Sequence, residues 1–189
     1  MQNINHDYAY IPRPLRFVST GEQLERVMSF RREEYRKRYA NIEMAGYDPF
    51  DRHSHIIFAE DKQGRINSTA RLVLDSEIGL PEDKLFPPLV KQYREEGKQL
   101  MEIGRFIIRD GDCSLLKKHY QAFYEIAKSS QVDYVVMIMR RKDLAFHKKL
   151  FGIDILIDAI GENFGSELTF MCAGWDVDNT RPAFFKWIK

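Results

Sequence analysis

Hydrophobic side chains recur at helical spacing near the start of the chain, over residues 20–39. The stripe follows Thr20, which stands three residues before Gln23 as in a capping box. The pattern predicts an amphipathic helix whose buried stripe contains Leu24, Val27, Met28 and Tyr35.

The rest of the chain alternates short apolar runs with longer amphipathic segments. The runs predict strands at residues 15–18, 55–59, 65–74, 99–109, 134–139, 153–157 and 168–173, with a hairpin turn at 61–64. The amphipathic segments predict helices at the end of residues 81–96, over 114–129 and over 143–151. This order predicts a single α/β domain over residues 15–189, preceded by an arm over 1–14. Its sheet should be mixed, largely antiparallel and flanked by helices.

Two charged residues interrupt the strand predicted at residues 99–109, which contains the sequence MEIGRFIIRDG. Glu102 and Arg105 lie among apolar neighbours, where a charge is costly unless it is paired or used. Residues three apart point to opposite faces of a regular strand. A β-bulge near Gly104 would bring both side chains to one face, and bulges are frequent beside active sites. The alternative is an internal salt bridge that braces the sheet.

Other charged residues occupy positions that raise the same question. Arg31 falls within the helical stripe, so it needs an internal partner or else extends to water from the edge of the stripe. Arg71 shares a strand face with small polar residues and is either a site residue or an exposed cross-strand partner. Asp48 and Asp51 lie in a YDPFD loop, where turn formation around the proline is a sufficient explanation for each residue alone.

Taken together, these residues have the spacing of a known family. Arg31 precedes Tyr35 by four positions, and Asp48 precedes Asp51 by three. Arg71 follows twenty positions after Asp51, and Glu102 and Arg105 form an E-x-x-R pair. Over about residues 17–156, this array resembles the acyl-homoserine lactone (autoinducer) synthases and the N-acyl amino acid synthases. The resemblance implies the GNAT-like acyltransferase fold and transfer of a fatty acyl group from a thioester to the amine of an amino acid or derivative.

Two departures from the autoinducer synthases are visible. Those enzymes carry a tryptophan after the first helix, where this chain offers only Tyr39, Asn41 or Tyr47. They usually read E-x-S-R-F where this chain reads EIGRF. The missing tryptophan favours an N-acyl amino acid synthase, and acyl-homoserine lactone synthesis is the alternative.

The turn after this strand bears on the acyl donor. Acetyl-CoA-dependent GNAT enzymes grip the CoA pyrophosphate with an R/Q-x-x-G-x-G/A turn, whereas residues 109–114 contain one glycine and two aspartates. The resemblance therefore implies the acyl-phosphopantetheine of an acyl carrier protein as cosubstrate, with acyl-CoA as the alternative and no permanently bound cofactor. An acidic carrier protein needs a basic surface, for which the candidates are Lys117, Lys118, Arg140, Arg141, Lys148 and Lys149.

Glu102 and Arg105 are the candidate catalytic residues. Glu102 is expected to take a proton from the acceptor amine, with its pKa raised by burial and lowered again by a neighbouring arginine. The candidates for substrate binding are Arg31, Tyr35, Asp48, Asp51, Arg71 and Phe106. His147 lies near the position where many GNAT enzymes carry a tyrosine that protonates the departing thiolate, but a surface histidine is the favoured interpretation.

Composition narrows the alternatives. A net charge of +1, with basic clusters that lack interleaved aromatic residues, argues against nucleic acid as a partner. No apolar run reaches the roughly 20 residues of a membrane span, and the first residues do not read as a signal peptide. Cys113 and Cys172 have neither metal-ligand nor disulfide spacing. We therefore expect no metal site, and we expect the protein to be located in the reducing cytoplasm. An acetyl-CoA-dependent acetyltransferase and a ligand-binding module without chemistry are the remaining alternatives.

Overall fold

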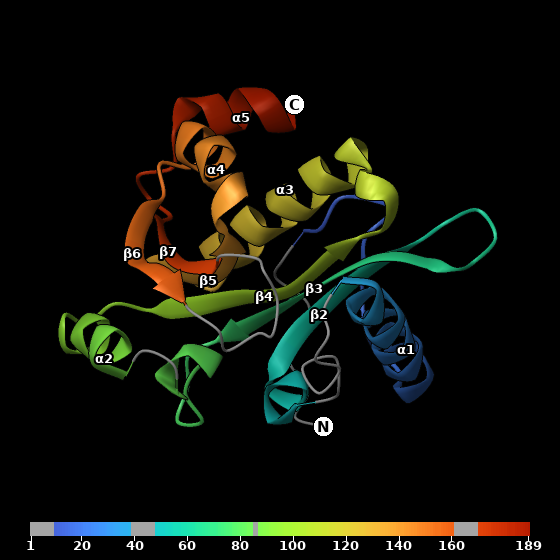
Figure 1. Cartoon of the computed structure of the whole chain (residues 1–189), viewed down its shortest axis with the longest axis horizontal. Helices are drawn as coiled ribbons and strands as arrows, with labels where there is room; N and C mark the ends of the chain where they lie inside the picture. Colours follow the sequence, from blue (N-terminus) through green and yellow to red (C-terminus); the bar gives the residue numbers. More distant parts are fainter. Residues whose placement is uncertain (1–9, 39–47, 85–86, 161–169) are drawn as a thin grey trace.

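The computed structural model describes residues 10–38, 48–84, 87–160 and 170–189 (Figure 1). Its helices are α1 (Gly21–Arg38), α2 (Pro87–Glu95), α3 (Cys113–Ser129), α4 (Leu144–Leu150) and α5 (Pro182–Ile188). Its short 3-10 turns are η3 (Pro49–His53), η4 (Pro81–Lys84), η5 (Arg109–Gly111) and η6 (Arg141–Asp143). Its strands are β1 (Arg16–Phe17), β2 (Ser54–Glu60), β3 (Ile66–Leu74), β4 (Leu100–Ile108), β5 (Tyr134–Arg140), β6 (Asp154–Ile160) and β7 (Phe170–Asp176).

The strands form one sheet in the order β1-β2-β3-β4-β5-β7-β6. Within the described part of the chain, β4 and β5 are parallel and the other neighbouring pairs are antiparallel. A parallel pair needs a long crossover connection, and α3 supplies it between β4 and β5. The predicted mixed, largely antiparallel sheet is confirmed.

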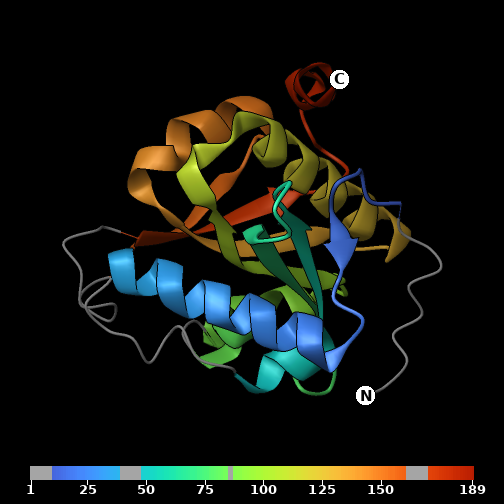
Figure 2. The ribbon, with the colours of Figure 1, turned by 90° about the vertical axis from the view of Figure 1, so that its right-hand side faces the viewer.

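Helices cover both faces of the sheet (Figures 1 and 2). On the face of α3, α4 and α5, one continuous apolar core includes Leu72, Met101 and Val135. The face of α1 and α2 is divided instead into two apolar clusters, one around Val27 of α1 and one around Val90 of α2. Polar and charged side chains on the central strands separate these two clusters.

The centre of the sheet contains two irregularities. β5 pairs with β4 only as far as Glu102, which lies opposite Val136, so the later parts of these two strands are not paired with each other. On the other side of β4, Arg71 pairs with Gly104 and Thr69 with Ile107, so Ala70 alone stands opposite Arg105 and Phe106. That two-against-one arrangement is the β-bulge expected near Gly104.

The observed elements lie within three residues of the predicted bounds wherever the predicted ends are described. The capping box is present, because the Gln23 backbone N–H donates to Thr20 Oγ1 and the Thr20 N–H to Gln23 Oε1, at 3.2 and 3.3 Å. The end predicted at Tyr39, the start predicted at residue 168 and most of the predicted arm lie outside the described residues. Helix α5 was not predicted, although Pro182 in its first turn is a usual start signal.

The close packing of β7 against β5 gives a direct test of the sheet. A Cβ added at Gly174 would lie 2.2 Å from Cε1 of Tyr134, whose ring stacks on Tyr93 of α2 at 4.7 Å. We expect Gly174→Ala to lower the free energy of unfolding by about 1–3 kcal/mol, because the buried ring must move. Gly21→Ala is the matched control, since among the described residues its added Cβ has no atom within 4 Å beyond its chain neighbours and the local helix backbone. Equal unfolding midpoints for the two variants in urea would contradict this packing.

Candidate active site

Charged side chains from α1, the η3 turn, β3 and β4 meet on the face of the sheet that α1 covers. Most are nearly inaccessible to solvent, with exposed fractions of 1% for Arg31, 2% for Arg71 and 5% for Glu102. The members of this cluster, called the charged network below, are Arg31, Asp48, Asp51, Arg71, Glu102 and Arg105. All of them are residues that the sequence singled out.

The YDPFD turn serves both local structure and the charged network. Asp48 Oδ1 accepts the Phe50 N–H at 2.9 Å, and Asp51 Oδ2 accepts the Asp48 N–H at 3.0 Å, which together form a capping box. The second oxygen of each carboxylate faces the arginines. Asp51 Oδ1 accepts from Arg31 Nη1 at 2.8 Å, and Asp48 Oδ2 accepts from Arg71 at 2.6 Å. The turn formation expected for this loop is therefore confirmed, and the same two carboxylates also belong to the charged network.

Arg71 is the centre of the charged network. Its Nη1 lies 2.6 Å from Asp48 Oδ2 and 3.8 Å from Asp51 Oδ1, and its Nη2 lies 3.4 Å from Glu102 Oε1. The guanidinium group thus connects the η3 turn to β4. Arg71 is not an exposed cross-strand partner, and Arg31 does not extend to water.

The bulge brings Arg105 to the same network, as predicted, but by a different backbone conformation. The left-handed conformation falls on Arg105 itself (φ 52°), and its Nη2 donates to Asp48 Oδ2 at 2.9 Å. Gly104 has another purpose, since a Cβ there would lie 1.8 Å from Glu102 Oε1. The glycine therefore leaves space for the Glu102 carboxylate, and the strain of the bulge is borne by a residue that the network holds.

Burial and pairing set the charges of this cluster. Burial raises the pKa of Glu102, and the charge of Arg71 opposes the shift, as expected from the sequence. Burial also disfavours the charge of Arg71, but Glu102 and Asp48 outweigh it and raise the pKa of that guanidinium. Burial likewise raises the pKa of Asp48, yet Arg71 and Arg105 outweigh it and bring that pKa below its ordinary value. Glu102 Oε2 is buried and has no hydrogen-bond partner among the described residues.

The two aromatic candidates lie on different faces of the sheet. Tyr35 of α1 lies beside the network, with the Arg105 guanidinium 5.9 Å from the centre of its ring. Phe106 points to the opposite face, where it packs against His119 and Phe123 of α3 with ring centroids 5.0 and 5.3 Å apart. The structure therefore does not bring Phe106 together with the other predicted binding residues.

His147 is not the surface residue that we expected. It is 8% exposed, its Nδ1 lies 2.7 Å from the Asp143 carbonyl oxygen, and its Nε2 is hydrogen-bonded to the Tyr120 hydroxyl. Burial lowers the pKa of this imidazole. The sequence interpretation failed because α4 is short and α5 covers it, with Trp187 packed on Phe146 at 5.4 Å.

A further buried acid was not predicted. Glu82 in η4 is 1% exposed, and its Oε2 has no hydrogen-bond partner among the described residues. Burial, and after it the charge of Glu102, raises the pKa of Glu82 well above its ordinary value. The surrounding sequence, LPEDK, reads as an ordinary polar turn, so only the tertiary structure reveals that this side chain points inward.

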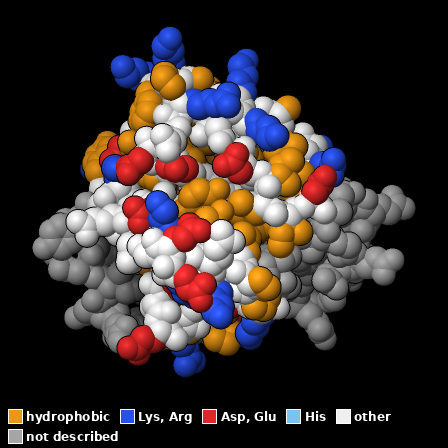
Figure 3. Space-filling view, turned by 90° about the vertical axis from the view of Figure 1, so that its left-hand side faces the viewer, with side chains coloured by type: hydrophobic (Ala, Val, Ile, Leu, Met, Phe, Trp, Pro, Cys, Tyr) orange, Lys and Arg blue, Asp and Glu red, His pale blue; other side chains and the backbone are white. Residues whose placement is uncertain are grey.

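The candidate docking residues lie on α3, at the end of β5, on η6 and on α4, and both of these helices cover the side of the sheet opposite α1. Lys148 and Lys149 are exposed and make no ion pair with another described residue, whereas Arg140 and Arg141 pair with Asp143 and Asp158. Lys117 stands 5.9 Å from the Trp187 ring of α5, next to Lys118. Figure 3 shows lysine and arginine side chains along the upper edge, the side where α4 and α5 lie in Figure 1.

The first turn of α3 satisfies its own backbone donors. Asp112 is the N-cap, and its Oδ1 accepts the N–H groups of Ser114 at 2.7 Å and of Leu115 at 3.2 Å. Asp110 and Gly111 before it both have positive φ, 57° and 66°. A carboxylate therefore occupies the donors that an anionic ligand would need at this helix end.

Neither a metal site nor a membrane-spanning helix is found within the described ranges. There, no three His, Cys, Asp or Glu side chains are grouped in a way that suits a metal ion. In the same ranges no helix combines the length and apolar character of a membrane span.

Comparison with known proteins identifies the family. A family model described as the N-acyl amino acid synthase FeeM matches residues 26–163, well over half of the chain. No curated protein matches the sequence.

Solved structures show the same fold at low sequence identity. FeeM, an N-acyl amino acid synthase from uncultured soil microbes, is 16% identical with a TM-score of 0.77, over 93% of this chain and 100% of that one. MesI, a CoA-dependent acyl-homoserine lactone synthase, is 18% identical with a TM-score of 0.63, over 92% of each chain. The acyl-homoserine lactone synthase LasI is 12% identical with a TM-score of 0.66, over 94% and 96% of the two chains. The fold is thus the GNAT-like fold of this group of acyltransferases, and the chain belongs to the FeeM family of N-acyl amino acid synthases.

Proposed function

We propose that the protein transfers a fatty acyl group from the phosphopantetheine thioester of an acyl carrier protein to the amine of an amino acid or derivative. The observation that carries the proposal is the environment of the Glu102 side chain. Its carboxylate is buried, is held by Arg71 at 3.4 Å and has one oxygen without a hydrogen-bond partner among the described residues, at the position where β4 and β5 cease to pair. A base in that place can serve an acceptor on the α1 side and a thioester in the opening of the sheet.

In the proposed reaction, Glu102 takes one proton from the acceptor ammonium, because only the free amine is a nucleophile. The amine nitrogen then forms a bond to the thioester carbonyl carbon, and the C–S bond breaks. The departing thiolate takes up the second proton that the nitrogen loses, so that an amide, a thiol and one proton on Glu102 result. A backbone N–H at the bulge is proposed to donate to the carbonyl oxygen as negative charge develops.

The rest of the charged network is proposed to hold the acceptor. Arg31 Nε and Nη2 and Arg71 Nε are buried without a hydrogen-bond partner among the described residues. Guanidinium groups bind carboxylates in a planar, often bidentate geometry, which suits the carboxylate of an amino acid. Asp48 and Asp51 fix these groups, Arg105 stands beside the base, and Tyr35 adds an aromatic wall.

An acyl carrier protein is proposed as the donor because of the hydrogen bonds at the N-terminus of α3. Asp112 already occupies the N–H groups that a pyrophosphate would use, and its charge would repel one. A carrier protein presents one phosphate and docks by its acidic surface, for which the lysines of α3 and α4 are suited. On this side Phe106 would line the donor half of the site.

Acyl-homoserine lactone synthesis is the second candidate, favoured by the likeness to MesI and LasI. MesI is described as CoA-dependent, so acyl-CoA is the alternative donor to test. Mass spectrometry of lipid extracts from a host that overproduces the protein separates N-acyl amino acids from acyl-homoserine lactones.

Glu102→Gln removes the proposed base and keeps its size. We expect the turnover number to fall by at least about a hundredfold, because general base catalysis contributes about 10²–10⁴. The unfolding midpoint should change little, since Arg71 keeps Asp48 as a partner. Glu95→Gln on the exposed end of α2 is the control. Turnover retained by a folded Glu102→Gln variant would remove this residue from the mechanism.

Gly104→Ala tests the position of the base without removing it. The new Cβ would meet Glu102 Oε1 at 1.8 Å, and because that atom ends a flexible side chain, the carboxylate should swing away from Arg71. We expect acyl transfer to fall about tenfold or more, with a loss of unfolding free energy of about 1–3 kcal/mol because the buried contact with Arg71 is broken. A wild-type rate in Gly104→Ala would show that the observed carboxylate position is not needed.

Lys148→Glu combined with Lys149→Glu tests the donor. With acyl carrier protein at low salt, KM should rise about three- to tenfold while the turnover number stays constant, because charges at the rim of an interface mainly steer association. Lys62→Glu combined with Lys91→Glu changes the net charge equally on exposed positions of the β2–β3 turn and α2, and serves as the control. Equal effects of the two pairs would exclude α4 as the docking surface.

A further inference from the structure

Glu82 is a buried carboxyl group that the proposed mechanism does not use. It forms no ion pair within the described part of the chain, and its Oε2 has no partner there. A buried carboxylate without a counter-ion is costly, so this residue needs an explanation of its own.

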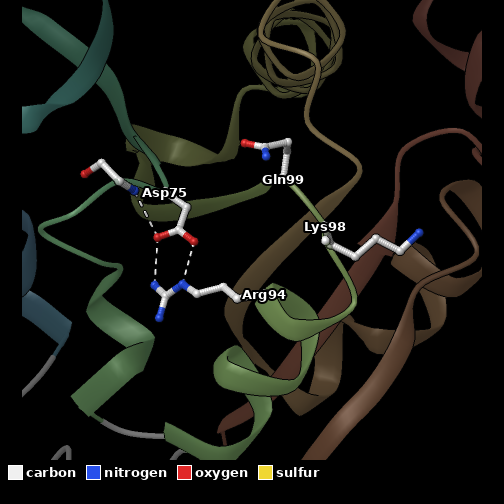
Figure 4. A pocket seen from close by; sticks show the side chains of 6 residues that line it. Asp75, Arg94, Lys98 and Gln99 are labelled. Carbon is white, nitrogen blue, oxygen red and sulfur yellow. Dashed lines mark hydrogen bonds and ion pairs between the residues drawn. The ribbon is translucent and has the colours of Figure 1, made fainter.

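The segment that carries Glu82 is fixed by hydrogen bonds from Arg94 of α2. Arg94 of α2 donates to both oxygens of Asp75 at 2.7 Å and to both oxygens of Asp83 at 2.6 Å (Figure 4 shows the bonds to Asp75). Asp83 Oδ2 also accepts the Leu80 N–H at 2.7 Å. Gly79 lies too close to Asp83 for a side chain, with only 2.5 Å between an added Cβ and Asp83 Oδ2. The residue next to Asp83 therefore has a fixed place.

The charges around Glu82 are already balanced without it. In the charged network, the three guanidinium groups contact the three carboxylates of Asp48, Asp51 and Glu102. Glu82 adds a fourth carboxyl group on the same side of the sheet as Glu102, because Leu80, two residues before Glu82, packs in one apolar cluster with Val73 and Val136, the two residues paired with Glu102 on the neighbouring strands. The charge of Glu102 raises the pKa of Glu82. The other charged or titratable groups that act on it are Arg71, which is occupied by three carboxylates, Asp83, which is bound to Arg94, and the buried Cys172 of β7.

We propose that Glu82 and Glu102 form a two-carboxyl unit in which Glu82 keeps its proton at neutral pH and so leaves Glu102 as the charged member. The proposal rests on the proposed function of Glu102 as the base. Glu82 acts through Glu102, which makes it a positioning residue. Pairs of carboxyl groups with separated pKa values are a common way to divide acid and base roles in an active site. When Glu82 ionises at higher pH, the site gains an uncompensated negative charge that opposes the oxyanion of the reaction.

The proton on Glu82 has a consequence for stability that does not depend on catalysis. Its pKa is raised in the folded state above the value of about 4.3 in the unfolded chain, so the folded state binds more protons between those two values. Its contribution to stability is therefore full below the unfolded pKa and is lost as the pH rises toward the folded pKa. Glu82→Gln, which is neutral at every pH, should abolish this loss.

The first experiment measures unfolding temperatures from about pH 5 to about pH 9 for the wild type, Glu82→Gln and the control Glu77→Gln, an exposed glutamate just before the same turn. The difference between Glu82→Gln and the wild type should grow with pH, by at least about 3 °C in favour of the variant, while Glu77→Gln follows the wild type. In a Glu102→Gln background the same difference should level off at lower pH, because the repelling charge has gone. A pH-independent difference, or the same pH profile in both backgrounds, would overturn the proposal.

The second experiment measures kcat/KM for acyl transfer against pH. Glu82→Gln should keep the acid limb, which reports Glu102, and lose the alkaline limb or move it to higher pH. Superimposable profiles of Glu82→Gln and the wild type would refute the coupling between the two carboxyl groups. If the wild type transfers no acyl group at all, the proposed function fails, and the unfolding experiment still decides the state of Glu82.

Discussion

The capping box of Asp48 and Asp51 is the interaction on which the candidate site depends. Each carboxylate uses one oxygen to close the η3 turn and the other to bind an arginine. Because Arg31 comes from α1, Arg71 from β3 and Arg105 from β4, this short turn ties together three elements that are distant in the sequence. Buried ion pairs of this kind seldom add net stability, since desolvation offsets most of their attraction. Their retention is better explained by the geometry that they impose on Glu102.

That geometry divides one face of the sheet. On the face of α3, apolar side chains continue across the central strands, whereas on the face of α1 and α2 the charged network lies between two separate apolar clusters. Along β3, Thr69 and Arg71 point to the polar face of the sheet, and Ala70 and Leu72 point to the opposite, apolar face. A polar site is thereby enclosed in a protein whose core is otherwise continuous, which strengthens each charge interaction by excluding water.

Much of this arrangement could be predicted from the sequence, because it depends on spacing. Arg31 on an apolar stripe, and Glu102 and Arg105 within an apolar strand, are anomalies that need internal partners, and the structure supplies them. The bulge was predicted from the parity of the strand, although its strained residue is Arg105 and Gly104 makes space for a carboxylate. Glu82 and His147 were missed for one reason: their burial is imposed by elements remote in the sequence, the Arg94 clamp and helix α5. Phe106 points to the other face because the bulge that brings Arg105 to the face of Glu102 also shifts the alternation of the next residue, and its role in substrate binding stays a prediction.

The position of Glu102 along β4 connects these observations. It is the last residue of β4 that pairs with β5. Two residues later, Gly104 pairs with Arg71 of β3, the neighbouring strand on the other side. The proposed base thus lies where the sheet opens on one side and where the bulge begins on the other. An acceptor held by the arginines and a thioester entering between β4 and β5 would approach it from different directions, so neither substrate has to pass the other. A regular, fully paired strand would close that route, and the two irregularities of β4 are therefore as necessary to the proposed reaction as the carboxylate itself.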